Sequence, residues 1–119
     1  LQYAHMKVIF DTSFIVMITE GPTPLYQQLV NIYDKVDPVV TRSVLRELDK
    51  VSKRKRIKVS GFVPAEIVEY NNNADDDIVR LAAERKIPVI TMDIELGKRL
   101  RSKGLTCLTG SKNKLIYFR

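Results

Sequence analysis

The sequence has almost none of the residues on which thiol and imidazole chemistry depends. Its 119 residues include one cysteine, Cys107, and one histidine, His5. A single cysteine excludes an intrachain disulfide and a cysteine-based zinc site. A single histidine so near the start leaves no Ser-His-Asp or Cys-His catalytic set to assemble, and no His-ligated zinc. Any catalysis must therefore come from other side chains.

Long apolar runs are also missing. The longest, residues 14–18, is far shorter than the roughly 20 residues of a membrane-spanning helix. No basic segment followed by an apolar stretch opens the sequence, as it would in a signal peptide. We therefore expect a cytoplasmic protein without a membrane partner. The length suits one domain. Residues 1–5 resemble an added segment before a natural start at Met6, so we expect the domain to span residues 6–119.

Charge of one sign predominates. Twenty basic residues oppose fourteen acidic ones, which gives a net charge of +6. One basic block consists of Lys53, Arg54, Lys55, Arg56 and Lys58. Acidic residues gather instead at residues 75–77, and none follows Glu95. A basic chain with a local acidic cluster suggests a polyanionic partner held around a cation. The alternative is a solvated basic surface that only aids solubility.

Short β-branched segments alternate with segments of helical periodicity. The pattern predicts strands at residues 7–10, 39–41, 66–70, 88–91, 105–108 and 114–118. It predicts helices at residues 14–19, 24–33, from about 43, from 74 or 75 to 86, and 93–103. Residues 53–64 fit either a short helix or a loop. This alternation predicts an α/β fold, a three-layer α/β/α sandwich with a central parallel sheet.

Two helices carry more detailed expectations. Thr12 or Ser13 can cap the first helix. In the second, we expect Leu25, Leu29 and Ile32 to share one inward face because their spacing is helical. The carboxyl ends of all parallel strands should meet at one edge of the sheet, which is where such folds bind ligands.

Carboxylates follow the strands at this edge. Asp11 ends the first strand and Asp93 lies just beyond the fourth, while residues 75–77 open the helix after the third. Glu47 lies about one turn into the helix after the second strand. Carboxylates gathered in one crevice repel one another, and a divalent cation relieves that repulsion. An all-oxygen site suits Mg²⁺ or Mn²⁺, which would activate a water for attack on a phosphodiester.

Each acid also has an ordinary structural explanation. Asp11 and Asp93 could be turn or cap residues, Glu47 an exposed helix charge, and residues 75–77 compensation of the helix dipole. What favours a site is that the acids recur in one order at one edge.

The same residues form four short motifs. They are VIFDTS at residues 8–13, VLREL at 44–48, ADDDI at 74–78 and TMDIEL at 91–96. In order and spacing this set resembles the PIN-domain ribonucleases. That family includes VapC-type toxins and the archaeal relatives of the nucleases that process small-subunit ribosomal RNA. The resemblance spans nearly the whole chain, although the segment after Lys58 is shorter than is usual in the family.

The resemblance implies roles for individual residues. It makes Asp11, Glu47, Asp76 and Asp93 the catalytic acids and metal ligands for Mg²⁺ or Mn²⁺. Asp76 is favoured within the aspartate run because Ile78, Val79 and Ala82 then fall where the family's helix is apolar, and Asp75 is the second choice. Ser13 and Thr91 would hold the carboxylates by hydrogen bonds, and Glu95 matches an acid of one branch of the family.

The resulting prediction is a metal-dependent endoribonuclease, acting in RNA processing and ribosomal RNA maturation or as a VapC-type toxin. The five residues of the basic block would border the crevice and hold RNA phosphates. Further partners consistent with the resemblance are an antitoxin, a ribosome-assembly protein or a second copy of the chain. A non-catalytic PIN module that binds RNA or protein is the alternative.

Overall fold

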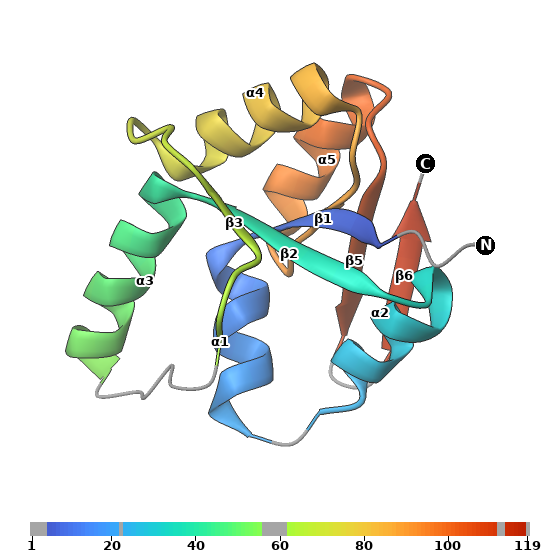
Figure 1. Cartoon of the computed structure of the whole chain (residues 1–119), viewed down its shortest axis with the longest axis horizontal. Coiled ribbons are helices and arrows are strands. Elements are labelled where there is room, and N and C mark those ends of the chain that lie inside the picture. Colours follow the sequence, from blue (N-terminus) through green and yellow to red (C-terminus); the bar gives the residue numbers. More distant parts are fainter. Residues whose placement is uncertain (1–4, 22, 56–61, 112–113, 119) are drawn as a thin grey trace.

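A six-stranded sheet forms the centre of the molecule in the computed structural model, which describes residues 5–21, 23–55, 62–111 and 114–118 (Figure 1). The strands lie in the order β3-β2-β1-β4-β5-β6. Their bounds are β1 Met6–Phe10, β2 Val36–Thr41, β3 Glu66–Val68, β4 Val89–Ile90, β5 Cys107–Ser111 and β6 Lys114–Phe118. The first five strands run parallel, and β6 pairs antiparallel with β5.

Helices cover both faces of the sheet. Their bounds are α1 Thr12–Glu20, α2 Leu25–Tyr33, α3 Arg42–Lys55, α4 Ala74–Arg85 and α5 Ile94–Ser102. In Figure 1, α4 and α5 lie above the strands and α1 and α2 lie below them, with α3 packed beside α1. The three-layer α/β/α sandwich is confirmed. No helix in the described part of the chain is both long and apolar enough to cross a membrane.

The core lies on both sides of the central strands. β1 is buried at its last three residues, and Phe10 meets Phe14 of α1 edge-on, with ring centroids 5.1 Å apart. Phe62 stacks on the same Phe10 ring at 5.8 Å. Burial of these rings and of the β-branched strand residues stabilises the sheet, because apolar surface is removed from water. It also fixes the end of β1, where Asp11 follows.

Five of the six strands differ in their bounds from the prediction, and for β2, β3 and β5 the structure shows the reason. β2 starts at Val36 because Met6 of β1 already pairs with it. β3 ends at Val68, where the Tyr70 N–H turns back to the Val68 carbonyl at 2.8 Å. β5 continues to Ser111 because it pairs with β6, and the pattern that predicts a strand at residues 114–118 does not reveal this pairing.

Two local expectations are wrong. Ile32 is 44% exposed, because in the last turn of α2 it is Tyr33 that packs against the core, while Leu25 and Leu29 are buried as expected. Neither Thr12 nor Ser13 caps α1. Asp11 holds the N-cap position without a capping hydrogen bond from its side chain, which is engaged elsewhere.

The end of α4 provides a test of backbone strain. Lys86 follows the helix with φ of 55°, a left-handed conformation that costs side-chain-bearing residues free energy. Lys86→Gly should therefore raise the free energy of unfolding by about 0.5 kcal/mol, measured by urea denaturation. Lys103 ends α5 with φ of −97°, so Lys103→Gly is the matched control and should lower stability. Equal effects of both changes would contradict the explanation.

Candidate functional site

The carboxylate of Asp11 lies at the end of β1, at the carboxyl edge of the sheet. Asp11 is only 4% exposed. Two hydroxyl groups donate to its Oδ2 atom, Thr91 Oγ1 at 2.6 Å and Ser13 Oγ at 2.9 Å. These are the hydrogen bonds that the resemblance implied for Ser13 and Thr91, and they hold a buried carboxylate in one orientation.

The same two hydroxyl groups also position the turn that follows β4. Ser13 Oγ accepts the Met92 N–H at 2.9 Å, and Thr91 Oγ1 accepts the Asp93 N–H at 3.0 Å. Asp93 is the N-cap of α5, where its Oδ1 accepts the N–H groups of Glu95 at 2.9 Å and Leu96 at 3.3 Å. One hydrogen-bond network therefore fixes Asp11 and Asp93 relative to each other.

Glu47 reaches the same edge from α3. The start of α3 is held against the segment that follows β3, because the Ser43 N–H donates to the Tyr70 carbonyl at 3.0 Å. Thr41 Oγ1 accepts the Val44 N–H at 3.2 Å and also contacts Ser43 Oγ at 2.8 Å. The anchored helix then presents Glu47.

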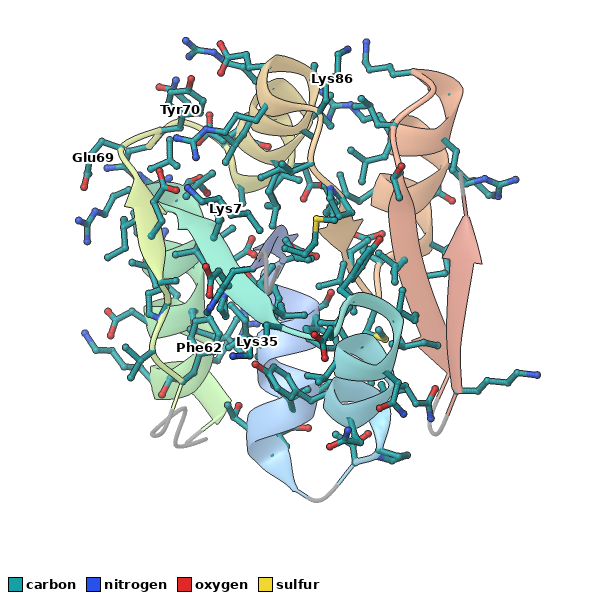
Figure 2. All side chains as sticks on the ribbon, turned by 45° about the vertical axis from the view of Figure 1, so that its right-hand side comes forward. Lys7, Lys35, Phe62, Glu69, Tyr70 and Lys86 are labelled. Carbon is teal, nitrogen blue, oxygen red and sulfur yellow. The ribbon has the colours of Figure 1, made fainter. Side chains whose placement is uncertain are left out.

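The segment between β3 and α4 is held by side chains of both helices that flank it. Glu69 and Tyr70 lie side by side after β3 (Figure 2). Arg42 pairs with Glu69 at 2.7 Å, and the Tyr70 hydroxyl donates to Glu84 of α4. Arg46 donates to the Asn71 side chain at 2.5 Å.

The turn that leads into α4 is also held by hydrogen bonds. Arg46 also donates to the Asn72 carbonyl at 2.8 Å. Asn73 caps α4, its Oδ1 accepting the Asp76 N–H at 3.1 Å. The start of α4, and with it the aspartate run, is therefore fixed against α3.

The three consecutive aspartates do three different things. Asp77 is buried and its Oδ2 accepts the Asn72 N–H at 2.9 Å, which closes the turn before α4. Asp76 is largely exposed and pairs with Arg99 of α5 at 2.5 Å. Asp75 is the one that lines the pocket described next. Successive helical side chains point about 100° apart, so neighbours cannot share a role.

A pocket of about 410 Å³ brings four acids together from four separate segments of the chain. Its lining residues are Asp11, Thr12, Ser13, Val16, Glu47, Val51, Asp75 and Asp93. None of these is basic. The predicted convergence of Asp11, Glu47 and Asp93 is therefore present, with Asp75 as the fourth acid.

Two acids predicted for the site lie outside the pocket. Asp76, the favoured third acid, is directed to Arg99, so its placement in the crevice is wrong and the second choice, Asp75, takes the position. Glu95 does not line the pocket either, and its exposed side chain lies 3.6 Å from Lys98. A signal for Asp75 existed in the sequence: it lies four residues before Val79, which is buried, whereas Asp76 lies four before the exposed Arg80.

Crowding of negative charge perturbs two of the acids. Burial raises the pKa of Asp11, although the hydrogen bonds from Thr91 and Ser13 oppose this. The pKa of Asp75 is raised by burial and then by the charges of Asp11, Asp93 and Glu47, with Arg99 acting weakly in the opposite direction. The Asp75 carboxylate therefore lies within the electrostatic influence of the other three acids of the pocket.

The basic block is only partly described. Lys53, Arg54 and Lys55 form the last turn of α3, and Arg56 and Lys58 lie outside the described residues. Lys53 is exposed and pairs with Asp49 at 3.1 Å. Arg54, also exposed, lies seven residues after Glu47 and three after Val51, which places it on the helix face that lines the pocket.

The donor set of the pocket fits a hard divalent cation. Four carboxylates with no neutralising base among the lining residues match the oxygen ligands that Mg²⁺ and Mn²⁺ prefer. Thr12, which also lines the pocket, has a buried hydroxyl without a hydrogen-bond partner in the described part of the chain, and such groups usually bind water or an ion. Within the described residues no three acids are close enough to form a closed ligand cluster, so a cation would draw the carboxylates together.

Comparisons with known proteins agree with this arrangement. In three dimensions the chain is similar to the PIN domain endonuclease Utp24, with a TM-score of 0.75 and 26% sequence identity over 95% of this chain and 91% of that one. No curated protein sequence matches. A family model described as a PIN like domain matches residues 8–110, which include all four acids of the pocket. The chain therefore belongs to the PIN-like domain family.

Proposed function

We propose that the chain is a metal-dependent endoribonuclease that cleaves RNA phosphodiester bonds at the pocket formed by Asp11, Glu47, Asp75 and Asp93. The observation that carries the proposal is the meeting of four carboxylates from four chain segments in one pocket without a basic residue. The similar Utp24 structure is that of a PIN domain endonuclease, which supports a nuclease activity.

The residues fit roles in cation binding. Asp11, Asp75 and Asp93 would hold Mg²⁺ or Mn²⁺, with Glu47 as a further ligand or as the group that orients water. A cation bound there would lower the pKa of a coordinated water and stabilise negative charge on the phosphodiester oxygens. Ser13 and Thr91 are positioning residues, because they hold the Asp11 carboxylate and the Asp93 turn.

Glu47 differs from the other acids in its surroundings. It is exposed on α3 and lines the pocket, whereas Asp11 is buried and held by two hydroxyl groups. A solvated carboxylate can accept a proton from an attacking water, which is the task of a general base. Asp11 is less suited to this task, because two hydroxyl groups already donate to its Oδ2 atom.

RNA is the proposed substrate because the chain is basic while the pocket is acidic. A net charge of +6 attracts a polyanion, and the exposed Arg54 continues the face of α3 beyond Glu47 and Val51. This arrangement would guide a phosphate backbone towards the carboxylates. Of the two biological settings, RNA processing and a toxin, the charge and the pocket favour neither.

The first prediction concerns cleavage. Asp75→Asn and Asp11→Asn should each lower cleavage of single-stranded RNA in Mn²⁺ by about 100-fold or more, because each removes a charged ligand. Asp76→Asn should cleave like the unmodified protein, because its side chain faces Arg99. The assay uses labelled RNA, DNA of the same sequence and an EDTA control.

Its outcomes separate the alternatives. Loss of activity in Asp76→Asn with normal activity in Asp75→Asn would contradict the assignment of the third acid. RNA binding without any cleavage in Mg²⁺ or Mn²⁺ would instead identify a non-catalytic binding module. Cleavage that persists in EDTA would overturn the metal dependence.

The second prediction concerns stability without metal. Folding raises the pKa of Asp11 and Asp75, so the folded state binds more protons than the unfolded state above their ordinary value of 3.8, and stability falls as pH rises through that window. Asp75→Asn should therefore stabilise the metal-free protein at neutral pH, by on the order of 0.5 kcal/mol in urea denaturation.

Addition of Mn²⁺ should make the unmodified protein more stable than Asp75→Asn. The cation should raise the melting temperature of the unmodified protein and of Asp76→Asn, and have little effect on Asp75→Asn, because only ligands of the folded state couple binding to stability. An equal response of all three proteins would argue that the pocket does not bind the cation.

The third prediction concerns the basic end of α3. Each phosphate contact adds about −0.7 to the slope of log affinity against log salt for a single strand. Arg54→Ala should flatten this slope by about that amount, measured by fluorescence anisotropy with RNA in EDTA. Lys53→Ala removes the same charge from the neighbouring position, where it pairs with Asp49, and should change the slope less. Identical slopes for both variants would indicate that Arg54 is an ordinary solvated residue without a phosphate contact of its own.

A further inference from the structure

A second groove lies beside the acidic pocket, between α5 and β5. It has a volume of about 250 Å³ and is lined by Ile94, Gly97, Lys98, Arg101 and Thr109. Residues 94, 97, 98 and 101 have the spacing of one helix face, and the opposite face of α5 buries Leu96 and Leu100 in the core. The groove is therefore formed by one continuous face of α5 and is not a gap left by imperfect packing.

The floor of the groove is apolar and open. Ile94 is 67% exposed, the second highest value among the large exposed apolar side chains of the described residues. Gly97 has no side chain, and a Cβ atom there would lie 3.6 Å from Cys107 Sγ. Since Gly97 is buried, Ile94 is the exposed apolar side chain of the groove.

Two consecutive residues of the chain line the two cavities. Ile94 follows Asp93, which lines the pocket. On the other wall, the Thr91 N–H donates to the Leu108 carbonyl at 3.0 Å, so Thr109 lies just beyond the level of Thr91, at the carboxyl edge of the sheet. Five residues of helix separate Asp93 from Lys98, about 7.5 Å along the axis. A strand bound at Asp93 can therefore continue directly into the groove.

The polar groups of the groove suit a nucleotide. Lys98 is exposed, and its contact with Glu95 is long, at 3.6 Å, between two solvated side chains. Such a surface pair contributes little, so a phosphate can replace it. The groove combines an apolar floor, the hydroxyl group of Thr109 and a cationic rim. Together these groups match a nucleotide, in which a base is joined to a phosphate, whereas an exposed aliphatic surface alone would not match it.

We propose that this groove binds the base of an unpaired nucleotide next to the one whose phosphate lies at the acids, with Lys98 near its phosphate. The proposal rests on the proposed function, because it takes RNA as the strand that passes Asp93. Ile94 is then a substrate-binding residue that acts on any base, since its surface offers no hydrogen bonds for sequence readout.

The test compares intact and abasic RNA. Binding of short oligouridylate and oligoadenylate strands, and of the same sugar–phosphate chain without bases, is measured by fluorescence anisotropy in EDTA, which blocks metal-dependent cleavage. Ile94→Ala should weaken binding of the intact strands about three- to ten-fold and leave the abasic strand unaffected, because only the base contacts the isoleucine. Ile32→Ala is the matched control, since Ile32 is 44% exposed on α2 and lines neither cavity.

Methyl NMR of isoleucine-labelled protein supplies an independent reading. Intact RNA should shift the Ile94 methyl resonances through the ring current of the base, whereas Ile32 serves as the internal reference in the same spectrum. Lys98→Ala should weaken binding of intact and abasic strands alike, and by more than Lys103→Ala, which removes the same charge at the end of α5.

Several results would overturn the inference. They are equal losses for intact and abasic RNA in Ile94→Ala, equal losses in Ile94→Ala and Ile32→Ala, or no shift of the Ile94 methyl groups. Failure of the proposed function looks different. In that case no cleavage occurs in Mg²⁺ or Mn²⁺, while the dependence of binding on Ile94 and on the base persists.

Discussion

Two hydroxyl groups that each donate to one buried carboxylate oxygen hold the site together. Ser13 and Thr91 donate to Asp11 Oδ2 and accept the backbone N–H groups of Met92 and Asp93. Each hydroxyl therefore uses its donor on one element and its acceptor on another. Since the Asp11 carboxylate is buried, loss of either donor would leave an anion less well satisfied in a place that water hardly reaches. This one arrangement fixes the residue after β1, the turn after β4 and the start of α5 relative to one another.

The other two acids are positioned by a second set of contacts, between α3 and the segment that precedes α4. Ser43 ties α3 to the segment after β3, and Arg46 ties the same helix to the turn that starts α4. Glu47 directly follows Arg46 on α3. The exposed acid and the turn that brings in Asp75 are therefore set by one helix, which explains how residues far apart in the sequence keep a common arrangement.

How far the sequence predicts the site depends on what each prediction uses. Asp11 and Asp93 follow buried strands, and the parallel connections of the sheet bring their ends to one edge, so their meeting was predictable. The aspartate run was harder, because three identical side chains on one helix turn differ only in direction. Four-residue spacing to Val79 favours Asp75, but the ion pair of Asp76 with Arg99 depends on how α4 and α5 pack, and no local pattern contains that.

The same distinction explains the misplaced structural details. Leu25 and Leu29 could be predicted from helical spacing, but Ile32 could not, because the neighbouring Tyr33 competes for the inward position at the end of α2. The extension of β5 depends on a strand that follows it, and the groove beside α5 depends on a missing side chain at Gly97. Features set by the period of one element or by the order of parallel strands were visible in the sequence, and features set by the packing of particular side chains or by strand pairing were not.

The raised pKa values of Asp11 and Asp75 imply that the pocket opposes folding of the empty chain. Selection for heat resistance alone would therefore favour variants that neutralise acids of the pocket. The residues that such a selection replaces most readily are those whose presence lowers the stability of the metal-free chain. A selection that alternates between heat and binding of divalent cations would retain them, so the two outcomes would map the site without any substrate.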